Sequence, residues 1–138
     1  ALRIQQAANF GYHLGMAFQL IDDTLDYSSD SLKDQELDLK NGIVNAVVFE
    51  VLTSRADLME RFKKGEDLTG LLSSVDMSSY VSKISQEATH YLEEASRALD
   101  ELNNYLAQSR LYENDSLGPH QAIEHLQMVI SYMGLRQQ

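Results

Sequence analysis

The stretch FQLIDDTLDY, residues 18–27, places three aspartates, Asp22, Asp23 and Asp26, inside an otherwise apolar run. Apolar residues that recur every three or four positions predict an amphipathic helix. Residues three, four and seven apart share one face of a helix. Gln19, Asp22 and Asp26 therefore line up on one face, and Asp23 lies about a quarter turn away.

Carboxylates held this close to a core repel one another and lose hydration unless a cation compensates them. Magnesium suits this task, because it takes one or two protein carboxylates and completes its octahedron with water and phosphate oxygens. The stretch predicts a face on which magnesium would anchor a diphosphate. The spacing alone leaves a second interpretation open, in which these acids form a solvated stripe on an amphipathic helix.

The composition favours one all-α domain over residues 1–138. The chain has 138 residues, 43% of them hydrophobic, with a single proline, and it lacks runs of alternating β-branched residues. The formal net charge of -10, spread along the chain, argues against nucleic-acid binding. No cysteine is available for a disulfide or a thiolate site, and no apolar run reaches the roughly 20 residues of a transmembrane helix.

Periodicity and capping signals predict five helices, separated by polar or glycine-containing segments. Serines and charges at residues 28–36 indicate a loop, and Gly134 is expected to end the last helix. The expected helices run from near the start to Tyr27, from Asp38 to Arg55, around Leu58 and Phe62, from Ser78 to Gln108, and from Pro119 onwards.

Other chemistry-bearing residues form no site of their own. His120 and His125 are five residues apart, a poor helical spacing for joint coordination, and His13 and His90 complete no ligand set. The apolar stripe of the 78–108 helix fits a packed bundle helix better than a coiled-coil seam, since it spans under four heptads.

The segment GMAFQLIDDTLDY resembles the second aspartate-rich motif of the trans-prenyl diphosphate synthases, whose recurring form is Phe-Gln-x-x-Asp-Asp-x-x-Asp. Residues 18–26 match that form throughout, and a lysine, an Asp-Leu pair and a glycine follow at matching intervals. These are Lys33, Asp38, Leu39 and Gly42. Residues 38–52 resemble the long-chain polyprenyl synthases that make quinone side chains.

The resemblance implies a helical bundle of the isoprenoid synthase type, of which this chain is the C-terminal portion. It implies that Asp22, Asp23 and Asp26 bind Mg²⁺ and act in catalysis, and that Gln19 and Lys33 contact the substrate. The implied reaction condenses isopentenyl diphosphate with an allylic diphosphate to give a polyprenyl diphosphate, a precursor of quinone side chains.

The family's first aspartate-rich motif has no counterpart here. We therefore expect the chain to be inactive without a missing N-terminal portion or a partner chain, and to form a homo- or hetero-oligomer with prenyl synthase chains. The implied location is mitochondrial for a eukaryotic quinone pathway and otherwise cytoplasmic.

Three alternatives stay open. A non-catalytic subunit that stabilises an active synthase is favoured by Ile43, Asn45 and Val47, which stand where the family often has lysine, threonine and proline. The intact 18–26 motif opposes it. A terpene cyclase is a weaker alternative, because its second metal motif usually carries Asn, Ser or Thr, and Glu. A plain helical interaction module ranks last.

Overall fold

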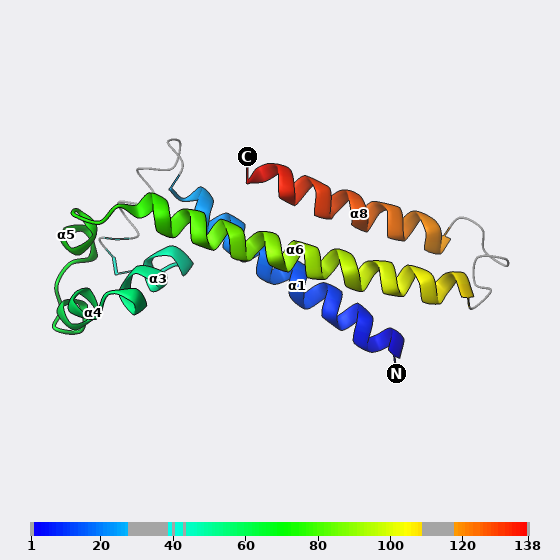
Figure 1. Ribbon diagram of the computed structural model, residues 1–138, viewed down its shortest axis with the longest axis horizontal. Helices are drawn as coiled ribbons and strands as arrows, with labels where there is room; N and C mark the ends of the chain where they lie inside the picture. The colour runs from blue at the N-terminus through cyan, green and yellow to red at the C-terminus, as the bar shows by residue number, and fades with distance from the viewer. Residues whose placement is uncertain (1, 28–38, 40, 43, 109–117, 138) are drawn as a thin grey trace. The chain divides into compact units, whose positions relative to one another are not determined.

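The regular structure of the part of the chain that can be described is entirely helical, which confirms the predicted all-α fold (Figure 1). The computed structural model describes residues 2–27, 39, 41–42, 44–108 and 118–137. Its helices are α1 (Leu2–Leu25), α3 (Ala46–Ser54), α4 (Ala56–Lys63), α5 (Leu68–Leu72), α6 (Met77–Gln108) and α8 (Gly118–Arg136). Among these helices, none is both long and apolar enough to cross a membrane.

The chain divides into two compact units, a first unit of residues 1–19 and 87–138 and a second unit of residues 20–86. In the first unit, parts of α1 and α6 meet at Tyr12 and Tyr91, whose ring centroids lie 6.3 Å apart. The Thr89 hydroxyl donates a hydrogen bond to the Gln137 side-chain oxygen at 3.0 Å, so that α8 also contacts α6. Three helical segments thus build the part of this unit that the structure describes.

The core of the first unit follows the apolar stripe that the sequence predicts for the 78–108 helix. Ala88, Ala95 and Leu99 on α6 are buried, as are Ile123 and Met133 on α8. Several large apolar side chains of α8 remain exposed, namely Met128, Val129, Tyr132 and Leu135.

The prediction that Gly134 ends the last helix is wrong, because α8 continues to Arg136. A Cβ atom added at Gly134 would lie 4.0 Å from Leu92 Cδ1. The glycine is a packing position against α6 and not a helix cap.

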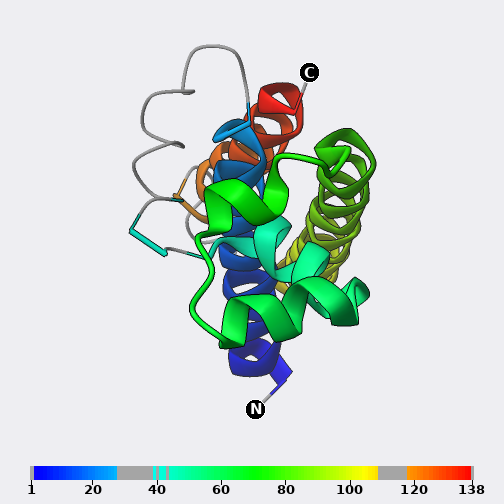
Figure 2. The same ribbon diagram turned by 90° about the vertical axis from the view of Figure 1, so that its left-hand side faces the viewer.

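The second unit includes the short helices α3, α4 and α5 (Figure 2), and their buried side chains form one apolar cluster. Gly65, with φ of +93°, follows α4, and its N–H donates to the Phe62 carbonyl at 3.0 Å. A positive φ is cheap only for glycine, so this residue turns the chain out of α4. The cluster consists of Val48, Val51, Leu52, Leu58, Leu68, Leu71 and Leu72.

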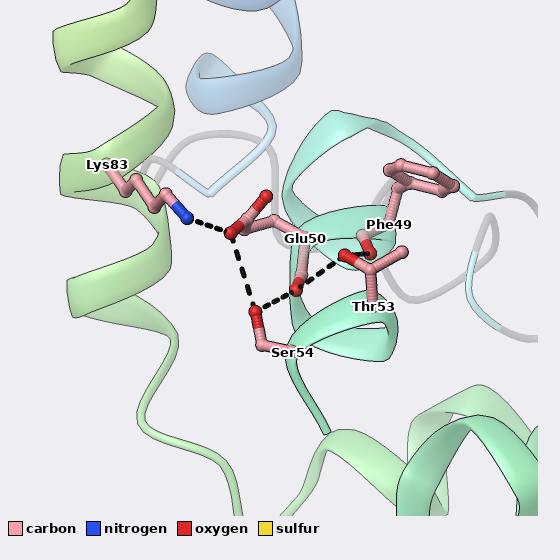
Figure 3. Close-up of polar contacts among 5 residues, drawn as sticks. All are labelled: Phe49, Glu50, Thr53, Ser54 and Lys83. Carbon is pink, nitrogen blue, oxygen red and sulfur yellow. Dashed lines mark hydrogen bonds and ion pairs between the residues drawn. The ribbon is translucent and has the colours of Figure 1, made fainter. Parts of the chain in front are cut away.

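A polar contact on α3 adds to this apolar packing within the second unit (Figure 3). The Lys83 ammonium group of α6 pairs with the Glu50 carboxylate of α3. The Ser54 hydroxyl donates to the Glu50 carbonyl at 2.6 Å, and the Thr53 hydroxyl donates to the Phe49 carbonyl at 2.9 Å. Such bonds offer the backbone an alternative to continued helix, and α3 ends at Ser54.

We predict that Leu71→Ala lowers the free energy of unfolding by about 2–5 kcal/mol, since Leu71 is 1% exposed and its loss leaves a cavity. Urea denaturation followed by circular dichroism measures this change. Leu135→Ala is the matched control, because Leu135 is 64% exposed and its truncation should change stability by about 0.5 kcal/mol or less. Equal effects of the two substitutions would contradict the assigned core.

The start of α6 gives a pH-dependent prediction. The Ser78 hydroxyl and then the Ser78 N–H, at 2.6 Å and 3.1 Å from Asp76 Oδ1, lower the pKa of Asp76 below its ordinary 3.8. Because the folded-state pKa is the lower one, this contribution is complete above the unfolded-state pKa and disappears as pH falls through the folded-state pKa.

Asp76→Ala should therefore lower the melting temperature at pH 7, and the difference from the unmodified chain should shrink towards pH 2. Thermal unfolding at both pH values measures it, with Ser82→Ala on the exposed side of α6 as the control. A difference independent of pH would show that the Asp76 carboxylate does not cap α6.

Candidate functional site

The predicted acidic face lies at the C-terminal end of α1. Asp22 and Asp23 belong to the last helical turn, and Asp26 directly follows Leu25, the last residue of α1. All three carboxylate side chains are half-buried, whereas Gln19, one turn earlier on the same helix, is exposed. Lys33 lies outside the described residues. The aspartates are thus neither core residues nor a fully solvated stripe.

The opposite side of this last turn is anchored in the core. Ile21 is fully buried and Thr24 is 8% exposed. The Thr24 hydroxyl donates to the Ile21 carbonyl at 2.8 Å, so this buried polar group is satisfied locally. Burial of these two side chains sets the rotation of the helix that carries the aspartates.

Asp26 sits where the helix gives way to a turn. Its N–H donates to the Asp22 carbonyl at 3.3 Å, longer than the usual 2.9–3.0 Å of such bonds. The next N–H, of Tyr27, donates to the Thr24 carbonyl at 3.1 Å, the shorter i to i+3 spacing of a closing turn. Asp26 therefore lies in the turn that closes α1.

The Asp23 carboxylate contacts the start of α3, a helix other than the one that carries it. The Ala46 N–H, at the first residue of α3, donates to Asp23 Oδ2 at 2.9 Å. Beside it, the Asn45 amide nitrogen lies 3.5 Å from the Tyr27 hydroxyl oxygen. The end of α1 and the start of α3 are joined by these polar contacts.

The helix predicted from Asp38 to Arg55 is interrupted: Leu39 is helical, a turn follows at Asn41 and Gly42, and α3 begins at Ala46. The Gly42 N–H donates to the Leu39 carbonyl at 3.1 Å and Gly42 has a φ of +73°, which makes a tight turn where helix was expected. Apolar periodicity runs on through such a turn, so it could not reveal the break. The predicted start itself, Asp38, lies outside the described residues.

Asn45, which stands where the family often has threonine, is the N-cap residue of α3. Its side-chain oxygen accepts a hydrogen bond from the Val48 N–H at 2.9 Å, and its backbone is extended, with φ of -90° and ψ of -178°. Asparagine is among the preferred N-cap residues. The signal that identifies it is a capping residue directly before the apolar run of residues 46–48.

The donor set of the acidic face suits a cation that binds phosphate as well as protein. Among the described residues, no three His, Cys, Asp or Glu side chains gather closely enough to hold a metal ion by themselves. Asp22 and Asp26, one turn apart and half-buried, offer two carboxylates. That number is what Mg²⁺ takes from protein when water and phosphate oxygens fill its remaining positions. The residues present therefore fit this ion.

The second unit also contains a cavity of about 360 Å³, distinct from the acidic face. Of the predicted site residues that the structure describes, Gln19, Asp22, Asp23 and Asp26, none lines it. Its walls are Leu39, Asn41, Gly42, Phe62, Gly65, Glu66, Asp67 and Leu68. The carboxylates of Glu66 and Asp67 in this wall are already engaged, by the Arg61 guanidinium and by the Thr69 N–H.

Fold and site together define an all-α protein with half-buried carboxylates clustered where a long helix ends. The model of the family described as Polyprenyl synthetase matches residues 2–77, more than half of the chain. The chain belongs to this polyprenyl synthetase family, as the resemblance of residues 18–26 predicts.

A curated relative extends the match. The chain is 31% identical over 101 residues to a protein of Cyanophora paradoxa described as "Prenyl transferase", and the match covers 68% of this chain. It covers 31% of the relative, so the chain spans about a third of that protein's length. No solved structure matches the chain.

The N-terminal cap of α3 gives a testable prediction. Asn45→Ala removes the acceptor of the Val48 N–H and should lower the free energy of unfolding by about 1 kcal/mol. Asn45→Thr, which restores the family's usual residue, keeps a capping oxygen and should recover most of that loss. Chemical denaturation measures both variants. Equal destabilisation by alanine and threonine would mean that the side-chain oxygen does not cap α3.

Proposed function

We propose that this chain is part of a trans-polyprenyl diphosphate synthase, which condenses isopentenyl diphosphate with an allylic diphosphate. The product would be a polyprenyl diphosphate of the kind that supplies quinone side chains. The observation that carries the proposal is the complete 18–26 motif, placed at the end of α1 and inside the region that the family model matches.

In this proposal, Asp22 and Asp26 hold Mg²⁺, and their half-buried positions keep them accessible to a phosphate group. The bound cation supplies positive charge to the leaving diphosphate. The chain's part in the reaction is to fix two carboxylates at the helix end, with Ile21 and Thr24 buried behind them. Gln19 and Lys33 would contact the diphosphate by hydrogen bonding and by charge.

The rest of the active site would come from outside this chain. The chain spans about a third of the relative's length, and α1 and α8 carry exposed large apolar side chains. We propose that residues 1–138 are the C-terminal helical domain of a larger synthase fold, inactive alone, and that prenyl synthase chains associate as a homo- or hetero-oligomer. The exposed apolar residues include Ile4, Tyr12, Met128 and Tyr132.

The compartment belongs to the same proposal. A quinone pathway in a eukaryote would place the synthase in mitochondria, and a bacterial one in the cytoplasm.

The second candidate is a non-catalytic subunit that stabilises an active synthase. Val47, where the family often has proline, favours it. Asn45 weighs against it, because the start of α3 is still capped. The two candidates differ in whether the Asp22 carboxylate is needed for turnover.

We predict that magnesium-dependent incorporation of labelled isopentenyl diphosphate, in the assembly of this chain with the remaining synthase portion, falls about 100-fold or more in Asp22→Asn. Removal of divalent cations by a chelator should abolish it, and added Mg²⁺ should restore it. Asp100→Asn, at an exposed position of α6, is the matched control. Turnover that survives Asp22→Asn would instead assign the chemistry to a partner chain.

A further inference from the structure

We propose that Asp23 is a positioning residue, whose carboxylate fixes the start of α3 against the end of α1 and thereby orients Asp26. In this arrangement the cation contacts Asp22 and Asp26, and Asp23 acts through the backbone. The inference rests on the proposed function, because it assigns different roles to the three aspartates of one motif.

The first step is the contact itself. The first N–H groups of a helix have no partner within that helix. Asn45 takes the Val48 N–H with its own side chain, and Asp23 Oδ2 takes the Ala46 N–H at 2.9 Å. A negative charge is also favoured at a helix N-terminus by the helix dipole. Asp23 thus has a structural partner 23 residues away along the chain.

The second step is the direction of the side chain. Consecutive residues of an α-helix are rotated by about 100°, so the Asp23 side chain leaves the helix about a quarter turn away from that of Asp22. Its Oδ2 atom lies at the start of α3. The Asp23 carboxylate is thus engaged by the start of α3, and Asp22 and Asp26 lie one turn apart on one face.

The third step links this contact to Asp26. Asp26 directly follows the last residue of α1, and its N–H donates a hydrogen bond to the Asp22 carbonyl at 3.3 Å. Residues on both sides of it, Asp23 and Tyr27, contact the start of α3 through Ala46 and Asn45. Loss of the Asp23 contact would release the turn that carries Asp26.

Hydrogen-bond acceptance and metal binding make different demands on residue 23. A neutral amide oxygen accepts an N–H as a carboxylate oxygen does, but it brings no negative charge to a cation. Asp23→Asn should therefore preserve the positioning role, and Asp23→Ala should remove it. If Asp23 were a metal ligand, both substitutions would weaken metal binding.

The first experiment measures hydrogen exchange of the Ala46 amide by NMR in the whole chain. Exchange should be about ten-fold faster in Asp23→Ala and within about three-fold of the unmodified chain in Asp23→Asn. Asp22→Asn is the matched control and should leave this amide unchanged. An Ala46 exchange rate that Asp23→Ala does not alter would overturn the proposal.

The second experiment titrates the chain with Mn²⁺ in the presence of inorganic pyrophosphate and follows the paramagnetic signal of free Mn²⁺. The dissociation constant should rise about ten-fold in Asp23→Ala, within the range known for residues that orient metal ligands, and much less in Asp23→Asn. Asp22→Asn should weaken binding more than either. Equal weakening by alanine and asparagine at position 23 would make Asp23 a ligand.

Ala46→Pro removes the donor without touching Asp23. Proline is tolerated at the first helical position and requires an extended residue before it, and Asn45 is extended. This variant should weaken Mn²⁺ binding as Asp23→Ala does, and the double variant should be no weaker than either. Normal Mn²⁺ binding by Ala46→Pro would overturn the positioning role.

Failure of the proposed function gives a different pattern. The chain could bind no Mn²⁺ with pyrophosphate and still show faster Ala46 exchange in Asp23→Ala. The α1–α3 contact would then serve fold stability alone, and both the proposed metal site and the role of Asp23 in it would be overturned.

Discussion

The last turn of α1, which is buried on one side and carries aspartates on the other, is the constraint on which the rest of the second unit depends. Ile21 and Thr24 must be buried, and the geometry of the helix then turns Asp22 towards the opposite side. Rotation of this turn by one residue would bring a carboxylate into the core, at the cost of several kcal/mol for an unpaired buried charge. The burial of Ile21 and Thr24 therefore sets the direction in which the acidic side of this turn faces.

The start of α3 provides the second support for the acidic face. Asp23, Asn45 and Tyr27 make a short polar network between two helix ends. Each such bond contributes about 1 kcal/mol net, and a helix start left without acceptors would cost at least as much. This network explains how the chain keeps a well-formed α3 although it lacks the family's usual threonine and proline.

Membership of the polyprenyl synthetase family connects these details to chemistry. The family match runs from α1 to the first residue of α6, and so includes the acidic face and nearly all of the second unit. Most of α6 and all of α8 lie outside it. The family match therefore supports a function at the segment where α1 ends and α3 begins. The exposed apolar side chains of α8 bear on a separate question, namely what else assembles with this chain.

Local patterns in the sequence by themselves determined the all-α fold, the extent of α1 and α6, and the alignment of Asp22 with Asp26. The reason is that the helical period of 3.6 residues can be read from the spacing of apolar residues close together in the chain. They did not reveal where α3 begins, since apolar periodicity passes through the turn at Gly42. Only the tertiary structure decided that Asp23 faces the Ala46 N–H and that Gly134 packs against Leu92. Both depend on which helices meet, and such contacts between distant residues leave no mark in the local spacing of the chain.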